Sequence, residues 1–136
     1  MDREVIEQKL ESLRHCLHRV AEKCPPDPET LGRDSDLQDI VVLNLTRAVQ
    51  LCVDIGAHII AGMEVPPPDT MGQTFDALAR AEVINENLAI RLKKAVGFRN
   101  IAVHNYGHVD WTIVHTLARH HLGDFSEFAT VISGRF

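Results

Sequence analysis

The chain has few aromatic residues, few cysteines and no excess of positive charge. Aromatic residues make up 5% of its 136 positions, too few for the base-stacking surfaces of single-strand binders. Its three cysteines (Cys16, Cys24 and Cys52) are odd in number and lack C-x-x-C spacing, which indicates reduced thiols in a cytoplasmic protein. Because the formal net charge is −5, binding to nucleic acid would require a local positive patch.

The sequence also lacks signs of membrane insertion or export. No apolar run approaches the ~18 residues needed to cross a bilayer, and the charged start MDRE lacks the apolar stretch of a secretory signal. A hydrophobic content of 45% with 24% charged residues is typical of a globular protein. We therefore expect a single cytoplasmic domain over residues 1–136 that does not associate with membranes.

Apolar residues recur at three- and four-residue spacing along most of the chain, which is the pattern of amphipathic helices. The predicted helices cover about 2–23, 35–61, 69–79, 85–106 and 111–133, the last interrupted near Gly123. Prolines near positions 25–28 and 66–68 separate the first three, and Gly107 is expected to end the fourth. No segment long enough to form a strand alternates apolar and polar residues. The sequence therefore predicts an all-α antiparallel bundle of four to five helices.

The segment 99–106, RNIAVHNY, ends the fourth predicted helix and combines Arg99, Asn100 and His104 with the chain's only tyrosine, Tyr106. Metal-independent RNA cleavage needs a base for the 2′-hydroxyl, a cation for the phosphate charge and an acid for the leaving oxygen. Histidine exchanges protons near neutral pH, and the planar guanidinium of arginine binds phosphate through two hydrogen bonds. Asn100 would add a neutral donor or orient the imidazole. These residues therefore predict phosphodiester chemistry.

Positive side chains also gather just ahead of this segment and within it. The predicted patch comprises Arg91, Lys93, Lys94, Arg99, His104 and His108. It is the one place where we expect the acidic chain to attract a phosphate backbone.

Helix geometry indicates that one chain carries only half of a site. Positions five apart differ by about 140° around a helix, so Arg99 and His104 do not share a face, whereas Asn100 and His104 do. A two-fold dimer that pairs this helix end with its copy would bring two arginines and two histidines into one cleft. The small residues Gly97 and Ala102 would allow the two helices to approach closely.

The pattern Arg-Asn-x-x-x-His-x-Tyr, late in a small helical chain, resembles the HEPN superfamily. More narrowly, it is similar to the HepT-like toxins encoded beside a minimal nucleotidyltransferase antitoxin, and segments 47–50, 54–59, 69–80 and 124–128 share the likeness. The resemblance implies a homodimeric, metal-independent endoribonuclease with its active site at the dimer interface and Arg99 and His104 as the catalytic pair. RNA and not DNA is the expected substrate, and no cofactor is implied.

The resemblance further implies that the antitoxin transfers AMP from ATP to Tyr106. The added phosphate and nucleoside would occupy the place of an RNA phosphate and repel it, which would silence the toxin.

The same residues could instead have purely structural roles. Arg99 could form an ion pair and His104 could cap a helix end, while Tyr106 could pack its ring and bond its hydroxyl locally. A non-catalytic helical partner of a nucleotidyltransferase is the alternative function, although such a scaffold would not need the pair of Arg99 and His104. A metal- or ligand-binding bundle is a third and weaker alternative.

Three residues of the second predicted helix are candidates for a supporting role. Asp54 and His58 are four apart and fit a buried or interfacial hydrogen-bonded pair better than a catalytic contribution. Arg47 and Asn44, three positions apart, could line the cleft, or could equally be solvated or lie between helices. The H-x-x-x-H spacing of His104 and His108 loses its shared face if Gly107 breaks the helix, so no bound metal is expected.

Overall fold

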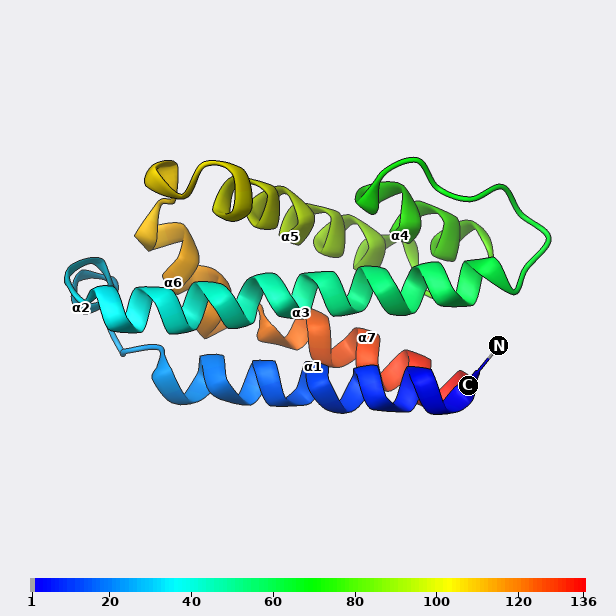
Figure 1. Cartoon of the computed structure of the whole chain (residues 1–136), viewed down its shortest axis with the longest axis horizontal. Helices are drawn as coiled ribbons and strands as arrows, with labels where there is room; N and C mark the ends of the chain where they lie inside the picture. Colours follow the sequence, from blue (N-terminus) through cyan, green and yellow to red (C-terminus); the bar gives the residue numbers. More distant parts are fainter. Residues whose placement is uncertain (1) are drawn as a thin grey trace.

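The chain forms a helical bundle in a computed structural model that describes residues 2–136 (Figure 1). Its α-helices are α1 (Arg3–Lys23), α2 (Pro28–Arg33), α3 (Ser35–Ala61), α4 (Met71–Arg80), α5 (Glu86–His104), α6 (Trp111–His120) and α7 (Leu122–Arg135). A short 3₁₀ helix, η1 (Tyr106–His108), follows α5, and no strand occurs between residues 2 and 136. The predicted all-α class is confirmed, but the bundle has seven α-helices where four to five were expected.

Helix α3 lies in the middle of the bundle, with α1 and α5 antiparallel to it on opposite sides (Figure 1). Its buried side chains include Val41, Leu45, Cys52, Ile55 and Ile59. By length and composition α3 could cross a membrane, contrary to the expectation from the sequence, yet 56% of its most apolar stretch is buried inside the bundle. A helix that is apolar on most of its faces is typical of a bundle core as well as of a membrane span.

Helix α2 was not predicted, because the prolines around it were interpreted only as a break. Asp27 caps the helix, since its carboxylate accepts a hydrogen bond from the backbone N–H of Thr30 at 2.9 Å. Pro28 is the first helical residue, where a missing N–H costs nothing because that donor would have no partner within the helix. The prolines therefore end α1 and also allow α2 to begin.

The predicted interruption near Gly123 is confirmed, and it lies at His121. His121 has φ −123° and ψ 8°, outside the helical range, and separates α6 from α7, so that Gly123 belongs to α7. The end of α5 also differs from the prediction: the helix stops at His104, and Asn105, with φ −151° and ψ 58°, is the capping residue. Gly107 lies in η1 and does not have positive φ, so it is not what ends α5.

Candidate active site

The predicted catalytic residues lie in the last turns of α5. Asn85 begins this helix by accepting a hydrogen bond from the N–H of Leu88 at 2.7 Å, and the helix is continuous from Glu86 to His104. Arg99 is half-buried, whereas Asn100 and His104 are exposed. Arg99 Nη1 donates to Asn100 Oδ1 at 3.2 Å, so the two side chains already lie together. The continuous helix places Arg99 and His104 on different faces, as predicted.

The guanidinium of Arg99 has no carboxylate partner. No Asp or Glu oxygen between residues 2 and 136 lies within 4.0 Å of it, so the predicted alternative of a structural ion pair is not found. His104 likewise has no side-chain hydrogen bond to the part of the chain that the structure describes. Both groups are therefore available to a ligand.

The predicted positive patch is smaller than expected. Arg91 binds the carboxylates of Asp124 and Glu127 on α7, with 3.2 Å between Arg91 Nη2 and Glu127 Oε1. Lys93 Nζ lies 3.1 Å from Asp76 on α4. Both cations are thus engaged in contacts between helices, and the sequence could not show this because their partners are 17 to 36 positions away.

Tyr106 packs its ring and bonds its hydroxyl within the chain, yet it stays accessible. Its hydroxyl donates to Asp39 Oδ1 on α3 at 2.9 Å, and its ring meets Trp111 edge to face with 5.9 Å between centroids. Burial, and next the hydrogen bond and charge of Asp39, raise the pKa of Tyr106 to about 12. The side chain nevertheless remains 41% exposed. The local packing expected as an alternative is present and leaves the residue within reach of a partner.

Asp39 and Trp111 are the residues of this region that the sequence did not reveal. Asp39 lies 67 positions before Tyr106, and no spacing rule connects the two. Trp111 is the first residue of α6, whose start was predicted from its cap: Asp110 accepts hydrogen bonds from the N–H groups of Thr112 and Ile113 at 2.9 and 3.3 Å. The pattern therefore located the helix that carries Trp111, but not the contact of its ring with Tyr106.

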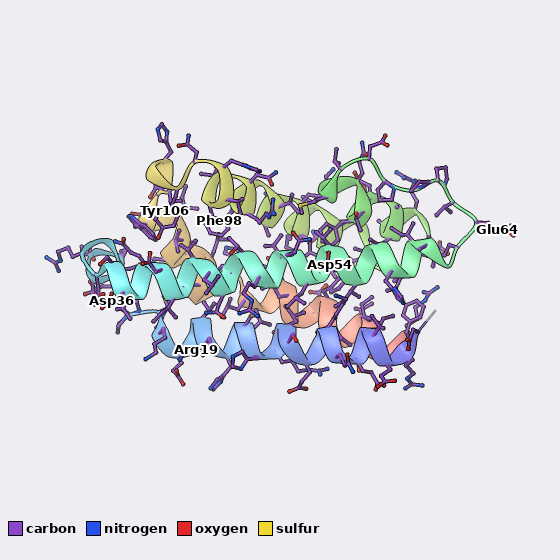
Figure 2. The ribbon with its side chains drawn as sticks, viewed as in Figure 1. Arg19, Asp36, Asp54, Glu64, Phe98 and Tyr106 are labelled. Atoms are coloured by element: carbon purple, nitrogen blue, oxygen red, sulfur yellow. The ribbon has the colours of Figure 1, made fainter. Side chains whose placement is uncertain are left out.

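The structure does not bring Asp54 and His58 to Arg99 and His104 within one chain. Asp54 accepts a hydrogen bond from Gln50 Nε2 at 2.8 Å and lies 3.9 Å from Lys9 Nζ on α1. His58 Nε2 accepts a hydrogen bond from the backbone N–H of Asp2 at 3.3 Å. Figure 2 shows Asp54 in the second half of α3, far along the bundle from Tyr106. Both side chains face the N-terminal part of α1.

Arg47 faces α1 as well. It lines a shallow hollow with Gln8, Glu11, Ser12 and His15. Its predicted companion Asn44 is buried and donates from its amide to the carbonyl oxygen of Ile40 at 2.8 Å, which leaves it no role in lining a cleft.

One of the two small residues expected at a dimer contact is turned inward. Ala102 is buried in the chain's own core at 7% exposure, so it does not face a partner, whereas a Cβ added to Gly97 would meet no atom within 4 Å. Large apolar side chains are exposed around the same helix end, with Ile101 at 49% and Val103 at 51%. A hollow of about 280 Å³ lies beside Ile101 and His108, and its lining also includes Phe98, Val109, Ile113 and Leu117.

His104 and His108 lie on separate elements, since α5 ends at His104 and His108 closes η1. Their H-x-x-x-H spacing therefore does not place them on one helical face. Over residues 2–136 the structure contains no group of three or more His, Cys, Asp or Glu side chains placed to hold a metal ion.

Comparison with known proteins places this geometry in a family. The sequence matches the family described as "Ribonuclease HepT-like" over residues 10–132. It is 36% identical over 129 residues to the mRNA nuclease HepT of Shewanella oneidensis, covering 95% of this chain and 96% of that protein. The fold matches the tri-AMPylated HEPN toxin of Shewanella oneidensis in complex with its MNT antitoxin, with a TM-score of 0.91, 36% identity and coverage of 99% and 100% of the two chains. A toxin–antitoxin crystal structure with AMP-PNP gives a TM-score of 0.92 at 34% identity, covering 98% and 100%. The chain therefore belongs to the HepT-like family of HEPN ribonuclease toxins.

Proposed function

We propose that this chain is the cytoplasmic toxin of a toxin–antitoxin pair and that it cleaves RNA with Arg99, Asn100 and His104, without a metal ion. The observation that supports this most is that the guanidinium of Arg99 has no carboxylate partner among residues 2–136, whereas Arg91, the other arginine of α5, is held by two carboxylates. An unneutralised cation at the accessible end of a helix is free to bind a phosphate. The matched relative from Shewanella oneidensis is an mRNA nuclease, an activity that these residues fit.

The chemistry follows from the three side chains. A neutral His104 imidazole takes the proton of a ribose 2′-hydroxyl, and that oxygen attacks the adjacent phosphorus. The bond from phosphorus to the 5′-oxygen breaks, and an imidazolium donates its proton to that oxygen. Arg99 stabilises the charge that develops on the non-bridging oxygens, and the Asn100 amide adds a neutral hydrogen bond. The products are a 2′,3′-cyclic phosphate and a 5′-hydroxyl.

We expect purified chain to cleave single-stranded RNA at an unchanged rate in excess EDTA, because no step of this reaction uses a metal ion. The products should carry 2′,3′-cyclic phosphate and 5′-hydroxyl ends, which end-specific enzymatic labelling and mass spectrometry distinguish from other termini. DNA of the same sequence should remain intact, since it lacks the attacking hydroxyl. Loss of cleavage in EDTA, or 3′-hydroxyl ends, would contradict the proposed reaction.

Two copies of the chain supply the two histidines that the reaction needs. A single His104 faces one side of the scissile phosphate, whereas a two-fold axis beside α5 would place a second His104 across the cleft. The exposed Ile101 and Val103 flank the catalytic residues and would be covered by such a contact. Because Gly97 has no side chain and faces open space, a helix of the second copy could approach α5 closely at this position.

A heterodimer with His104→Ala in one protomer tests the shared cleft. If both histidines serve one reaction, this heterodimer should lose about 10²-fold or more in cleavage rate, because one proton transfer is missing. Two independent sites would instead retain half of the rate. Protomers with different affinity tags, co-expressed and purified over both tags, give the pure heterodimer. A matched heterodimer with His120→Ala in one protomer should keep the wild-type rate, because His120 is exposed at the last position of α6 and lies outside the predicted positive patch.

Tyr106 is the proposed acceptor of AMP from ATP, transferred by a cognate minimal nucleotidyltransferase antitoxin. It is the chain's only tyrosine, it is 41% exposed, and it follows His104 by two positions. The matched toxin of Shewanella oneidensis is tri-AMPylated in its complex with the MNT antitoxin. A phosphodiester and a nucleoside at this position would repel and block an RNA phosphate bound by Arg99.

A further inference from the structure

The carboxylate of Asp39 is the charged group in direct contact with the Tyr106 hydroxyl. Its Oδ1 atom accepts a hydrogen bond of 2.9 Å from that hydroxyl, so that the contact joins α3 to η1. Asp39 is itself exposed and forms no ion pair with the residues from 2 to 136. It takes no part in the proposed cleavage of RNA, so the cleavage chemistry does not explain this contact.

The contact leaves the hydroxyl oxygen ready to react. A phenol has one proton and two lone pairs, and donation to Asp39 uses the proton only. The edge-to-face packing against Trp111, at an interplanar angle of 69°, limits rotation of the Tyr106 ring. Trp111 is fixed in turn at the start of α6, which Asp110 caps. The oxygen is thus held at the surface with its proton already directed at a carboxylate. Figure 2 shows Tyr106 at the same end of the bundle as Asp36, near the start of α3.

We propose that Asp39 is the general base for the transfer of AMP to Tyr106. The phenolic oxygen forms a bond to the α-phosphorus of ATP, the bond from that phosphorus to the bridging oxygen of the β-phosphate breaks, and pyrophosphate leaves. The phenolic proton passes to the carboxylate of Asp39. This inference rests on the proposed modification of Tyr106 and names a residue of the toxin, rather than of its partner, that takes part in the chemistry.

A base is needed because the hydroxyl does not ionise readily by itself. Burial and the charge of Asp39 raise the pKa of Tyr106 to about 12, so little phenolate exists near neutral pH. As the bond to phosphorus forms, the hydroxyl becomes strongly acidic, and a carboxylate already within hydrogen-bond distance accepts the proton. The same charge that opposes early ionisation therefore assists the transfer itself.

The test compares wild type, Asp39→Asn and Asp36→Asn. Asp36 lies three positions earlier on α3, is exposed and forms no hydrogen bond with Tyr106. Asp36→Asn therefore removes the same charge without removing the hydrogen-bond acceptor of the Tyr106 hydroxyl. Each toxin is incubated with the cognate minimal nucleotidyltransferase and ATP, and initial AMP incorporation is followed by intact mass spectrometry. Near neutral pH, Asp39→Asn should react about 10²-fold or more slowly than wild type, whereas Asp36→Asn should match it.

The pH dependence separates a base from a structural role. The amide of Asp39→Asn still accepts a hydrogen bond, but it does not take up the proton. Its rate should therefore rise about tenfold per pH unit up to pH 9, as the small phenolate fraction grows, and its deficit should shrink. A deficit that stays constant with pH would overturn the assignment, as would equal rates in wild type and variant with Tyr106 modified in both. Unchanged RNA cleavage by Asp39→Asn confirms that the variant folds.

A pH titration of the Tyr106 hydroxyl in the toxin alone, without antitoxin or ATP, tests the hydrogen bond between Tyr106 and Asp39. Because Tyr106 is the only tyrosine, tyrosinate absorbance reports on this one residue. The wild-type pKa should be about 12, and Asp39→Asn should lower it toward, but not to, the usual value of about 10, since burial remains. An unchanged pKa would show that the contact is absent in solution and would overturn the inference. If instead the titration shifts as expected but wild type takes up no AMP on Tyr106, the proposed function fails and the base assignment fails with it.

Discussion

Replacing His104 with alanine should lower the rate of RNA cleavage by about 10²–10⁴-fold, because it removes the group proposed to move protons at both ends of the scissile bond. His104 is exposed at the last position of α5 and has no side-chain hydrogen bond to residues 2–136, so the change costs the fold little. The measurement is single-turnover cleavage of a labelled RNA by the purified protein. In cells, inducing the wild-type chain alone should stop growth, and inducing His104→Ala should not.

His120→Ala is the matched control for this prediction. His120 is another exposed histidine at the last position of a helix, but that helix is α6, and His120 lies outside the predicted positive patch. It should cleave RNA at the wild-type rate. Toxicity of His104→Ala equal to that of wild type, or a harmless wild-type chain, would favour the alternative of a non-catalytic partner for a nucleotidyltransferase.

Arg99→Lys tests whether the shape of the guanidinium, and not only its charge, is needed for RNA cleavage. Lysine keeps the charge but not the planar fork that gives two parallel hydrogen bonds to a phosphate. The variant should therefore cleave poorly even though its net charge is unchanged. A wild-type rate for Arg99→Lys would mean that the guanidinium contributes only long-range charge. In that case the unpaired state of Arg99 would not be the basis of the activity.

Helical periodicity was enough to predict most of the fold, because each long helix buries a face of apolar residues at regular spacing. It was not enough where local backbone chemistry decides the outcome. Helix α2 depends on a cap by Asp27 and a proline at its first position, and the end of α5 depends on the backbone angles of Asn105 rather than on Gly107. Short elements of this kind carry too few apolar residues to show a period.

The candidate site was predictable only as far as it lies within one segment of sequence. Arg99, Asn100, His104 and Tyr106 are close together in the chain, so their order and helical spacing indicated a common role. The pairing of Arg91 with Asp124 and the contact of Tyr106 with Asp39 join distant helices, and only tertiary packing produces them. The sequence therefore predicted a larger positive patch than the structure contains, because it does not show that Arg91 and Lys93 are paired with carboxylates. For the same reason it gave no sign that Asp39 lies beside Tyr106.

Replacing Tyr106 with phenylalanine should abolish AMP transfer while leaving RNA cleavage near the wild-type rate. Phenylalanine keeps the ring that packs against Trp111 and removes only the hydroxyl, together with its hydrogen bond to Asp39. That bond lies at the surface, so its loss should cost at most about 1 kcal/mol of stability. Because the chain has no other tyrosine, no second phenol is present to accept AMP. Mass spectrometry of the toxin after incubation with antitoxin and ATP should show AMP on the wild-type peptide that contains Tyr106 and none on the variant.

Co-expression shows what this modification does in cells. Antitoxin should rescue growth of cells that express the wild-type toxin and should fail with Tyr106→Phe, since that variant keeps an active cleft that cannot be blocked by a nucleotide. Adding His104→Ala to Tyr106→Phe should restore growth, because toxicity then has no catalytic source. Rescue of Tyr106→Phe by antitoxin as complete as that of wild type would mean that binding alone silences the toxin. AMP found on another residue would mean that the accessible hydroxyl beside Asp39 is not the acceptor. Arg99 and His104 remain intact in Tyr106→Phe, so this variant loses the proposed AMP acceptor and keeps the proposed catalytic groups. Failure of antitoxin to rescue growth would therefore mean that silencing requires modification of Tyr106, because binding of the antitoxin alone would then not stop cleavage.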